Sequence, residues 1–170
     1  MDLIVKLIPL TMEHAPTLLT FEQKNRGWFE LHITPREEDF YTLLGVQTHI
    51  AELLLDQTLN RAYSTLLLDR HDNLVGRVNL ANIHQGKAFL GYRLGKPWVK
   101  KGLAKKGVKL MIEQAKILKL KRLVALASVT NIASQKVLTS QGFKAHHRLA
   151  KFTQVQGETL DCIEYRLDLN

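Results

Sequence analysis

The chain has 170 residues, of which 45% are hydrophobic and 24% are charged, and it carries a formal net charge of +8. This length and composition are typical of one folded domain, and they exclude a disordered chain that cannot form its own core. The single cysteine, Cys162, excludes an intrachain disulfide and a zinc site built from several cysteines, and we expect it to be a small buried strand residue.

The spacing of apolar and turn-forming residues predicts a mixture of strands and helices along the whole chain. In chain order, the predicted elements are a strand at 4–10, helices at 12–24 and 37–58, strands at 63–69, 74–83 and 88–94, a helix at 102–118, a strand at 122–128, a helix at 132–140, and strands at 143–152 and 159–168. No repeat or low-complexity stretch interrupts this order, so we expect a single α/β domain over residues 1–170.

Particular residues mark the boundaries of these elements. Thr11 is a suitable N-cap for the first helix, and the sequence 25–27 should end that helix ahead of an aromatic loop over 28–35. The second helical region should be broken near Gly45. The strand at 122–128 is almost entirely apolar, which predicts a central strand that is buried on both faces.

The N-terminal segment has none of the features of a signal peptide. Lys6 interrupts its apolar run, and neither a cationic stretch nor a small-residue cleavage site accompanies it. No apolar run in the chain approaches the roughly 20 residues of a membrane helix. We therefore expect a cytoplasmic protein that does not associate with a membrane.

Charge is distributed unevenly along the chain. Residues 93–122 contain eleven Lys or Arg and one acid, Glu113, whereas residues 12–56 contain eight acids and three basic residues. The first segment suits an anion and the second suits a cation. A nucleic-acid binder would need only the first, and few aromatic residues interleave with its lysines as stacking platforms, so the pattern argues against nucleic acid.

The segment after the strand at 88–94 has features of an anion site. Gly102 and Ala104 open the next helix and allow backbone N–H groups to face outward, where the helix dipole favours a pyrophosphate. A tight turn beside a solvated lysine face explains the same residues equally well. Four lysines flank this helix start: Lys100, Lys101, Lys105 and Lys106.

A second segment combines a helix start with a defined helix end. Asn131 is a suitable N-cap for the helix at 132–140, Ser134 lies at its third position, and Gly142 suits the position after its end. Capping and core packing explain this segment without any function when it is considered alone.

Together, these two segments resemble the acetyl-CoA-binding segments of the GNAT superfamily of N-acetyltransferases. The family pattern R/Q-x-x-G-x-G/A is matched by Gly102 and Ala104, with Val99 in its first slot. The later part of the pattern, N-x-x-S/A followed by G-F, is matched by Asn131, Ser134, Gly142 and Phe143. Residues 25–28, 76–80 and 90–93 are most similar to the Rim-type branch, which acetylates protein N-terminal amines.

The resemblance implies a fold and a cofactor site. The fold would be a mixed, mostly antiparallel sheet of about seven strands, splayed at its centre, with helices on both faces. Acetyl-CoA would place its pantetheine arm between the strands at 88–94 and 122–128. The implied cofactor-binding residues are Tyr92, Arg93, Leu94, Val99, Lys100, Lys101, Gly102, Leu103, Ala104, Lys105, Asn131 and Ser134.

The resemblance also implies direct attack of a primary amine in a ternary complex, without an acyl-enzyme and without a metal. Ser134 would donate a proton or hydrogen bond to the leaving thiolate, and Glu30 is a candidate to bind or deprotonate the amine. The candidate acceptor-binding residues are Asn25, Trp28, Phe29 and Glu30. Trp28 and Phe29 are equally suited to filling the core between the first two helices.

Two positions depart from the family pattern and leave alternatives open. Phe89 occupies a slot where relatives often carry a carboxylate, and Leu138 one where many carry a general-acid tyrosine. A catalytically weak acyl-CoA-binding module is therefore an alternative function. Without a strong base, a protein N-terminal α-amine of pKa about 7.7–8.0 is easier to deprotonate than a lysine of about 10.4, although small amines such as polyamines or antibiotics also fit. The residues suit either a monomer or a homodimer.

Overall fold

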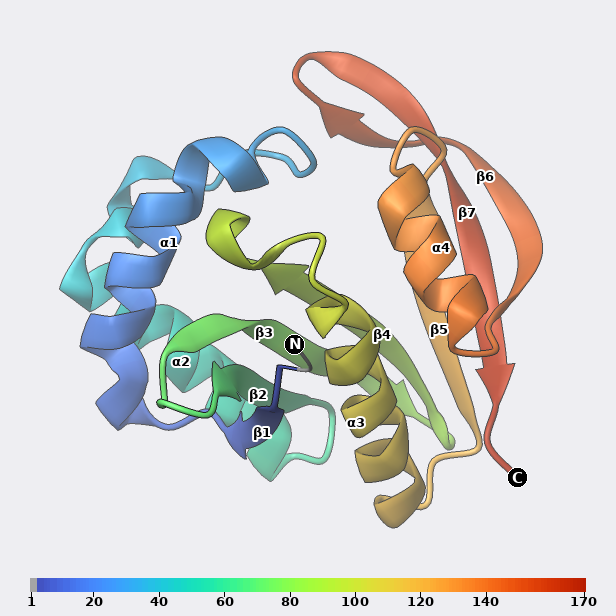
Figure 1. Cartoon of the computed structure of the whole chain (residues 1–170), viewed down its shortest axis with the longest axis horizontal. Helices are drawn as coiled ribbons and strands as arrows, with labels where there is room; N and C mark the ends of the chain where they lie inside the picture. The colour runs from blue at the N-terminus through green and yellow to red at the C-terminus, as the bar shows by residue number, and fades with distance from the viewer. Residues whose placement is uncertain (1–2) are drawn as a thin grey trace.

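The computed structural model describes residues 3–170, which form seven strands, four α-helices and three short 3-10 segments (Figure 1). Their bounds are β1 (Val5–Pro9), η1 (Met12–His14), α1 (Ala15–Phe29), η2 (Glu38–Tyr41), α2 (Leu43–Thr58), β2 (Tyr63–Asp69), β3 (Leu74–His84), β4 (Lys87–Leu94), η3 (Lys96–Trp98), α3 (Leu103–Ile117), β5 (Arg122–Ser128), α4 (Ile132–Ser140), β6 (Lys144–Val155) and β7 (Glu158–Asp168).

The seven strands form one sheet in the order β1-β2-β3-β4-β5-β7-β6. Neighbouring strands are antiparallel except β4 and β5, which are parallel. This parallel pair is short, because it joins only Lys87 to Arg122, Ala88 to Leu123 and Phe89 to Val124. Figure 1 shows the two strands running apart beyond these residues. The mixed, mostly antiparallel sheet with a central splay is therefore confirmed.

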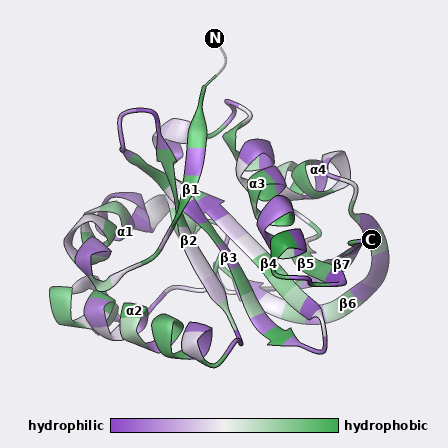
Figure 2. Cartoon of the chain, turned by 90° about the horizontal axis from the view of Figure 1, so that it is seen from below, coloured by the Kyte–Doolittle hydropathy of each residue, from purple (hydrophilic) through white to green (hydrophobic). Residues whose placement is uncertain are grey.

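Helices cover both faces of the sheet, as predicted (Figure 2). Strand β2 shows the division, because its side chains alternate between the two faces. Leu66 and Leu68 pack in a cluster with α1 and α2, whereas Leu67 packs with Leu103 of α3 on the opposite face. The apolar residues of β5 are buried from Leu123 to Ala125, which confirms a central strand covered on both sides.

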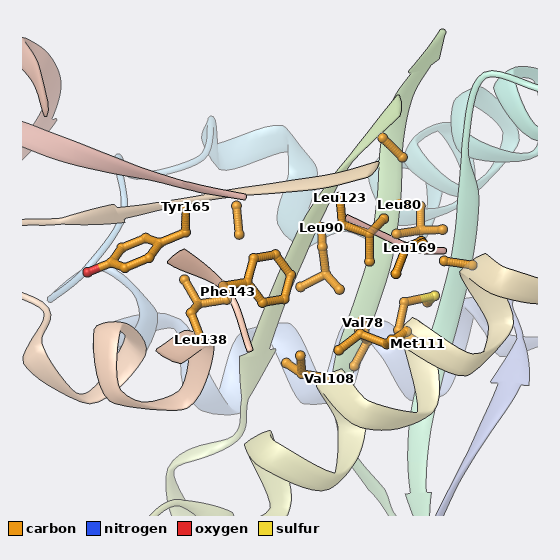
Figure 3. Packing of buried hydrophobic residues seen from close by; sticks show 14 of the residues in the cluster. Val78, Leu80, Leu90, Val108, Met111, Leu123, Leu138, Phe143, Tyr165 and Leu169 are labelled. Atoms are coloured by element: carbon orange, nitrogen blue, oxygen red, sulfur yellow. The ribbon is translucent and has the colours of Figure 1, made fainter. Parts of the chain in front are cut away.

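The larger core lies between the sheet and the helices α3 and α4. Figure 3 shows Leu138 of α4 beside Phe143, with Val78, Leu90 and Met111 further along the same core. Leu138 is 1% exposed, so the position that carries a tyrosine in many relatives is occupied here by a core residue. Cys162 is buried in β7, which confirms the prediction of a small buried strand residue.

The end of the first helix differs from the prediction. The sequence 25–27 does not stop α1, which continues through Trp28 and ends at Phe29. Asn25 is tolerated within the helix because its side chain is buried and bonded on both sides: Nδ2 donates to the carbonyl of Phe21, and Oδ1 accepts from the backbone N–H of Lys96. One of these partners, Lys96, lies far away in the sequence, so local propensity gives the wrong boundary.

The break in the second helical region also lies elsewhere than predicted. Thr42, not Gly45, separates η2 from α2, and its hydroxyl accepts a hydrogen bond from the N–H of Gly45 at 2.9 Å. Gly45 lies inside the helix, where a Cβ would come within 2.1 Å of the carbonyl oxygen of Asp39. The glycine therefore permits a close backbone approach rather than a break.

Candidate functional site

Beyond their three paired residues, β4 and β5 separate, so the two strand edges that face each other across the splay are not paired with each other. Strand β4 remains paired with β3 as far as Leu94, and β5 remains paired with β7 as far as Ser128, so the sheet stays intact on either side. Gly91, in the splayed part of β4, has open space where a Cβ would project. Backbone N–H and C=O groups on such an edge can bond an extended ligand as another strand would.

The start of α3 lies directly after this strand and has the geometry of an anion site. Lys100 and Gly102 adopt left-handed conformations with φ of 61° and 76°, which turn the chain sharply into the helix. Gly102 is the N-cap residue, and no side chain caps the helix from that position. The first-turn N–H groups of this 15-residue helix are thus available to an anion, which the helix dipole also favours.

The side chains around the α3 start fall into two groups. Leu103 is 1% exposed and packs in the core with Leu94, so these two residues can offer a ligand only their backbone groups. Lys101 lies 5.5 Å from the ring of Trp98. Lysines 100, 101 and 105 are exposed, which places three cations around the uncapped helix end.

A side-chain contact bridges β4 and α4 across the splay. Asn131 caps α4 as predicted, because its Oδ1 accepts from the N–H of Ser134 at 3.1 Å. The hydroxyl of Tyr92 donates to Ser134 Oγ at 3.4 Å, a long hydrogen bond. Burial raises the pKa of Tyr92, so the phenol keeps its proton at neutral pH. The sequence pointed to Ser134 but gave Tyr92 no role beyond its backbone.

The predicted acceptor residues lie at the end of α1, on the other face of the sheet. Trp28 Nε1 donates to the carbonyl of Leu94 at 3.2 Å, so this ring is fixed against the end of β4. Phe29 is 5% exposed and packs against Phe21 at 5.6 Å between ring centroids, which gives it a core position. The aromatic loop predicted from residue 28 therefore begins after both rings rather than before them.

Glu30 follows α1 and pairs with Arg26 at 3.1 Å. Its side chain is 28% exposed and lies one residue after the buried Phe29. The structure places Asn25, Trp28, Phe29 and Glu30 near one end of α1, but only Trp28 contacts β4 through a hydrogen bond.

Comparison with known proteins identifies the family. The family described as "Acetyltransferase (GNAT) domain" matches residues 5–144. This chain belongs to the GNAT acetyltransferase family. A Bacillus subtilis (strain 168) protein described as "Probable N-acetyltransferase YjcK" is 30% identical over 154 residues, which cover 88% of this chain and 85% of that protein.

Two solved structures share the fold of this acetyltransferase. Ribosomal-protein-S5-alanine acetyltransferase from Vibrio fischeri has a TM-score of 0.91 at 22% identity, covering 96% of this chain and 92% of that one. Spermidine N-acetyltransferase from Vibrio cholerae, in complex with CoA and spermine, has a TM-score of 0.83 at 17% identity, with coverage of 96% and 95%. The GNAT fold is confirmed, Rim-type enzymes are among the solved structures that share it, and the chain is an N-acetyltransferase.

The acetyltransferase also contains a buried charge network that the sequence analysis missed. Glu22 of α1 is 0% exposed, and its Oε1 accepts from Arg77 Nη1 of β3 at 3.0 Å. Arg93 of β4 lies 3.7 Å from the other carboxylate oxygen. The signal was present in the helical spacing, because Glu22 shares the buried face of α1 with Leu18 and Phe29.

Arginines form ion pairs with some of the acidic residues that were expected to attract a cation. Arg26 binds Glu38 as well as Glu30, and this pairing lowers the pKa of Glu38. Together with Glu22, three of the eight acids in residues 12–56 are therefore engaged by guanidinium groups. The expectation of a general cation-attracting surface does not hold for these three positions.

Two further findings concern membranes and metals. No helix within residues 3–170 combines the length and apolar character needed to cross a membrane. Among the same residues, no three His, Cys, Asp or Glu side chains gather closely enough to hold a metal ion. The rings of His146 and His147 pack edge to face with 4.2 Å between their centroids, and no third ligand lies beside them in that part of the structure.

Proposed function

We propose that this single acetyltransferase domain, over residues 1–170, transfers the acetyl group of acetyl-CoA to a primary amine by direct attack in a ternary complex. The acceptor is a protein N-terminal α-amine or a small-molecule amine. The observation that carries this proposal is the splay itself, with an uncapped helix start at Gly102 on one side and the Tyr92–Ser134 contact across it.

The cofactor fits the residues that the splay exposes. The free edge of β4 from Leu90 to Leu94 would bond the amides of the pantetheine arm, and the first turn of α3 would hold the pyrophosphate. Lys100, Lys101 and Lys105 would add attraction for its negative charge. The CoA bound to the spermidine N-acetyltransferase of Vibrio cholerae supports this assignment by analogy of fold.

Ser134 and Tyr92 would handle the proton on the leaving side. Amine attack on the thioester forms the C–N bond and breaks the C–S bond, and the departing thiolate takes a proton from the Ser134 hydroxyl, which the Tyr92 hydroxyl replenishes. The proton that the amine releases to solvent balances the one that Tyr92 then takes back from solvent. Tyr92 suits this role because its raised pKa keeps it protonated until a base forms beside it. Tyr92 would thereby take the role of the general-acid tyrosine expected at position 138, where this chain has the buried Leu138.

The amine would approach from the α1 side of β4 and must lose a proton to attack. Glu30 remains our candidate to bind or deprotonate it, although its pairing with Arg26 makes binding the simpler role. Weak base assistance favours an amine of low pKa, which an N-terminal α-amine has. The S5-alanine acetyltransferase of Vibrio fischeri shares the fold, and an acceptor of that kind supports a protein N-terminus for this chain.

A thiol-release assay tests the proposal. Purified protein would receive acetyl-CoA with N-terminal peptides, polyamines, amino acids or aminoglycosides, and free CoA would be followed with a thiol reagent. We expect amine-dependent CoA release with a subset of these acceptors, and binding of CoA by calorimetry. Binding of CoA without release for any amine would instead favour the acyl-CoA-binding module, and absence of both would refute the proposal.

A further inference from the structure

Two arginines pair with one buried carboxylate on the α1 face of β4, and a third arginine lies near them. Arg77 of β3 and Arg93 of β4 both pair with Glu22, and their side chains are only 3% and 23% exposed. Arg36, from the segment between α1 and η2, lies over the ring of Phe40, which packs edge-on against His49, and His49 in turn contacts Arg77. The charge of Arg36 also lowers the pKa of Arg77 and Arg93. We call Arg36, Arg77 and Arg93 the arginine cluster.

The charges of the arginine cluster are not balanced by the protein. Two guanidinium groups pair with Glu22 and that of Arg36 lies nearby, so these four groups carry a net charge of +2. His49 does not offset them: burial and the three nearby arginines lower its pKa to about 3, so its neutral ring accepts from Arg77 Nη2 at 3.0 Å. The neighbouring Arg26 pairs with two acids that lie further out, so the four arginines and three acids of the whole region keep one excess positive charge. Burying uncompensated charge is costly, so a further anion would stabilise this region.

Guanidinium groups in the cluster also have unused hydrogen-bond donors. Arg36 Nε, Arg77 Nε and Arg93 Nη1 are buried and have no hydrogen-bond partner among residues 3–170. Arg36 is the most informative of the three, because no carboxylate in the described chain pairs with it. Arg93 and Glu22 form an ion pair at 3.7 Å, which is beyond hydrogen-bond distance, so Glu22 does not use this donor.

Aromatic rings hold two of these guanidinium groups in place. Arg36 lies over Phe40 at 4.2 Å, and Arg93 lies over Phe29 at 4.9 Å. A stacked guanidinium presents its N–H groups at its edge, in a planar fork that matches two oxygens of a carboxylate or phosphate. The cluster is therefore fixed in a form suited to an oxyanion.

The position of the arginine cluster connects it with acetyl transfer. Arg93 follows Tyr92 directly in the splayed part of β4, and adjacent side chains of a strand project to opposite faces. Tyr92 reaches Ser134 on the α4 face, whereas Arg93 reaches Phe29 on the α1 face. Tyr92 and Arg93 therefore flank the same open edge of β4, one on each face of the sheet.

We propose that the arginine cluster binds an oxyanion of the acceptor, so that the substrate is a primary amine that also carries a carboxylate or phosphate group. This inference rests on the proposed function, because it assumes that the amine meets acetyl-CoA in the splay. It narrows the acceptor class and disfavours polycationic amines, which three guanidinium groups would repel.

Matched acceptors test the inference directly. Values of kcat/KM for CoA release would be compared within three pairs: 4-aminobutyrate with butylamine, phosphoethanolamine with ethanolamine, and N-terminal peptides with Glu or Gln as second residue. We expect kcat/KM to be higher for the anionic member by about 10-fold or more, which corresponds to the contribution of one hydrogen bond to a charged group. The pair with the largest ratio shows whether a carboxylate, a phosphate or an acidic N-terminus is preferred.

Variants then assign the preference to the arginine cluster. Arg36→Gln should reduce the ratio of anionic to neutral acceptor by about 10-fold, and Arg36→Lys should restore part of it by keeping the charge. Arg70→Gln, at an exposed position after β2, is the matched control and should leave the ratio unchanged. Circular dichroism would confirm that each variant is folded.

The outcomes separate this inference from the proposed function. Acetyl transfer with a ratio near one, or with spermidine preferred over every anionic amine, would overturn the subsite while leaving the acetyltransferase assignment in place. The subsite would also be overturned if the Arg36→Gln variant lowered kcat/KM equally for the anionic and the neutral acceptor of each pair. If the wild-type protein released no CoA with any amine, the proposed function itself would be overturned, together with the subsite.

Discussion

The two faces of the sheet at the β4–β5 splay are built from different materials. On the α3 and α4 face, the candidate cofactor site uses backbone groups and a few side chains from residues 88–105 and 131–134. On the α1 face, the charged network joins side chains from α1, α2, β3 and β4, which are far apart in the chain. The first face is encoded locally and follows a family pattern, whereas the second exists only after folding, and we propose that it selects the acceptor.

The largest effect should come from the α4 face. Ser134→Ala removes the proposed proton donor and should lower kcat by roughly 10²–10⁴-fold, with a much smaller change in the Kd for CoA. Tyr92→Phe removes the group that returns a proton to Ser134 and should also lower kcat, by roughly 10²-fold. Steady-state CoA release and calorimetry measure both quantities. Equal activity of Ser134→Ala and wild type would remove Ser134 from the mechanism.

A comparison of two carboxylates on the α1 face should give the next largest effect. Glu22→Gln leaves Arg77 buried without its counter-charge and should lower the free energy of unfolding by about 3–5 kcal/mol. Glu30→Gln breaks a partly exposed pair with Arg26 and should cost less than about 1 kcal/mol. Urea denaturation followed by circular dichroism measures both. Similar losses in the two variants would contradict the difference in burial.

The smallest effect concerns acid stability, again on the α1 face. Burial and the nearby arginines lower the pKa of His49 to about 3, below the roughly 6.5 of an unfolded histidine. Between these values the unfolded chain binds the extra proton, so stability falls as the pH falls below 6.5, by about 2 kcal/mol at pH 5.

Replacing the histidine tests this pH dependence. His49→Gln keeps an acceptor for Arg77 but cannot titrate, so its unfolding free energy should change less between pH 7 and pH 5 than that of wild type. His71→Gln, in the exposed turn after β2, should follow the wild-type curve. If the His49→Gln and wild-type curves ran parallel, this histidine would not be held neutral by the arginine cluster.

Element types were predictable because most of them depend on local spacing. Strand β5 and helix α4 begin and end where their apolar pattern and caps place them. The end of α1 and the start of α2 were not predicted correctly. Asn25 stays within α1 because its side chain accepts a hydrogen bond from the N–H of Lys96, and Gly45 lies within α2 because it allows a close approach to the carbonyl of Asp39. Both errors occur where a side chain or backbone group has a partner that local propensity does not include.

The sequence by itself determined the sheet-and-helix order, the helix start at Gly102, the cap at Asn131 and the family resemblance that these residues carry. Short-range capping and hydrophobic periodicity fix these features within a few residues of each other. Only the tertiary structure decided that Tyr92 meets Ser134 and that Glu22 lies among arginines. Those contacts depend on strand register and helix packing, which bring distant charges together in a low-dielectric interior where each one changes the others.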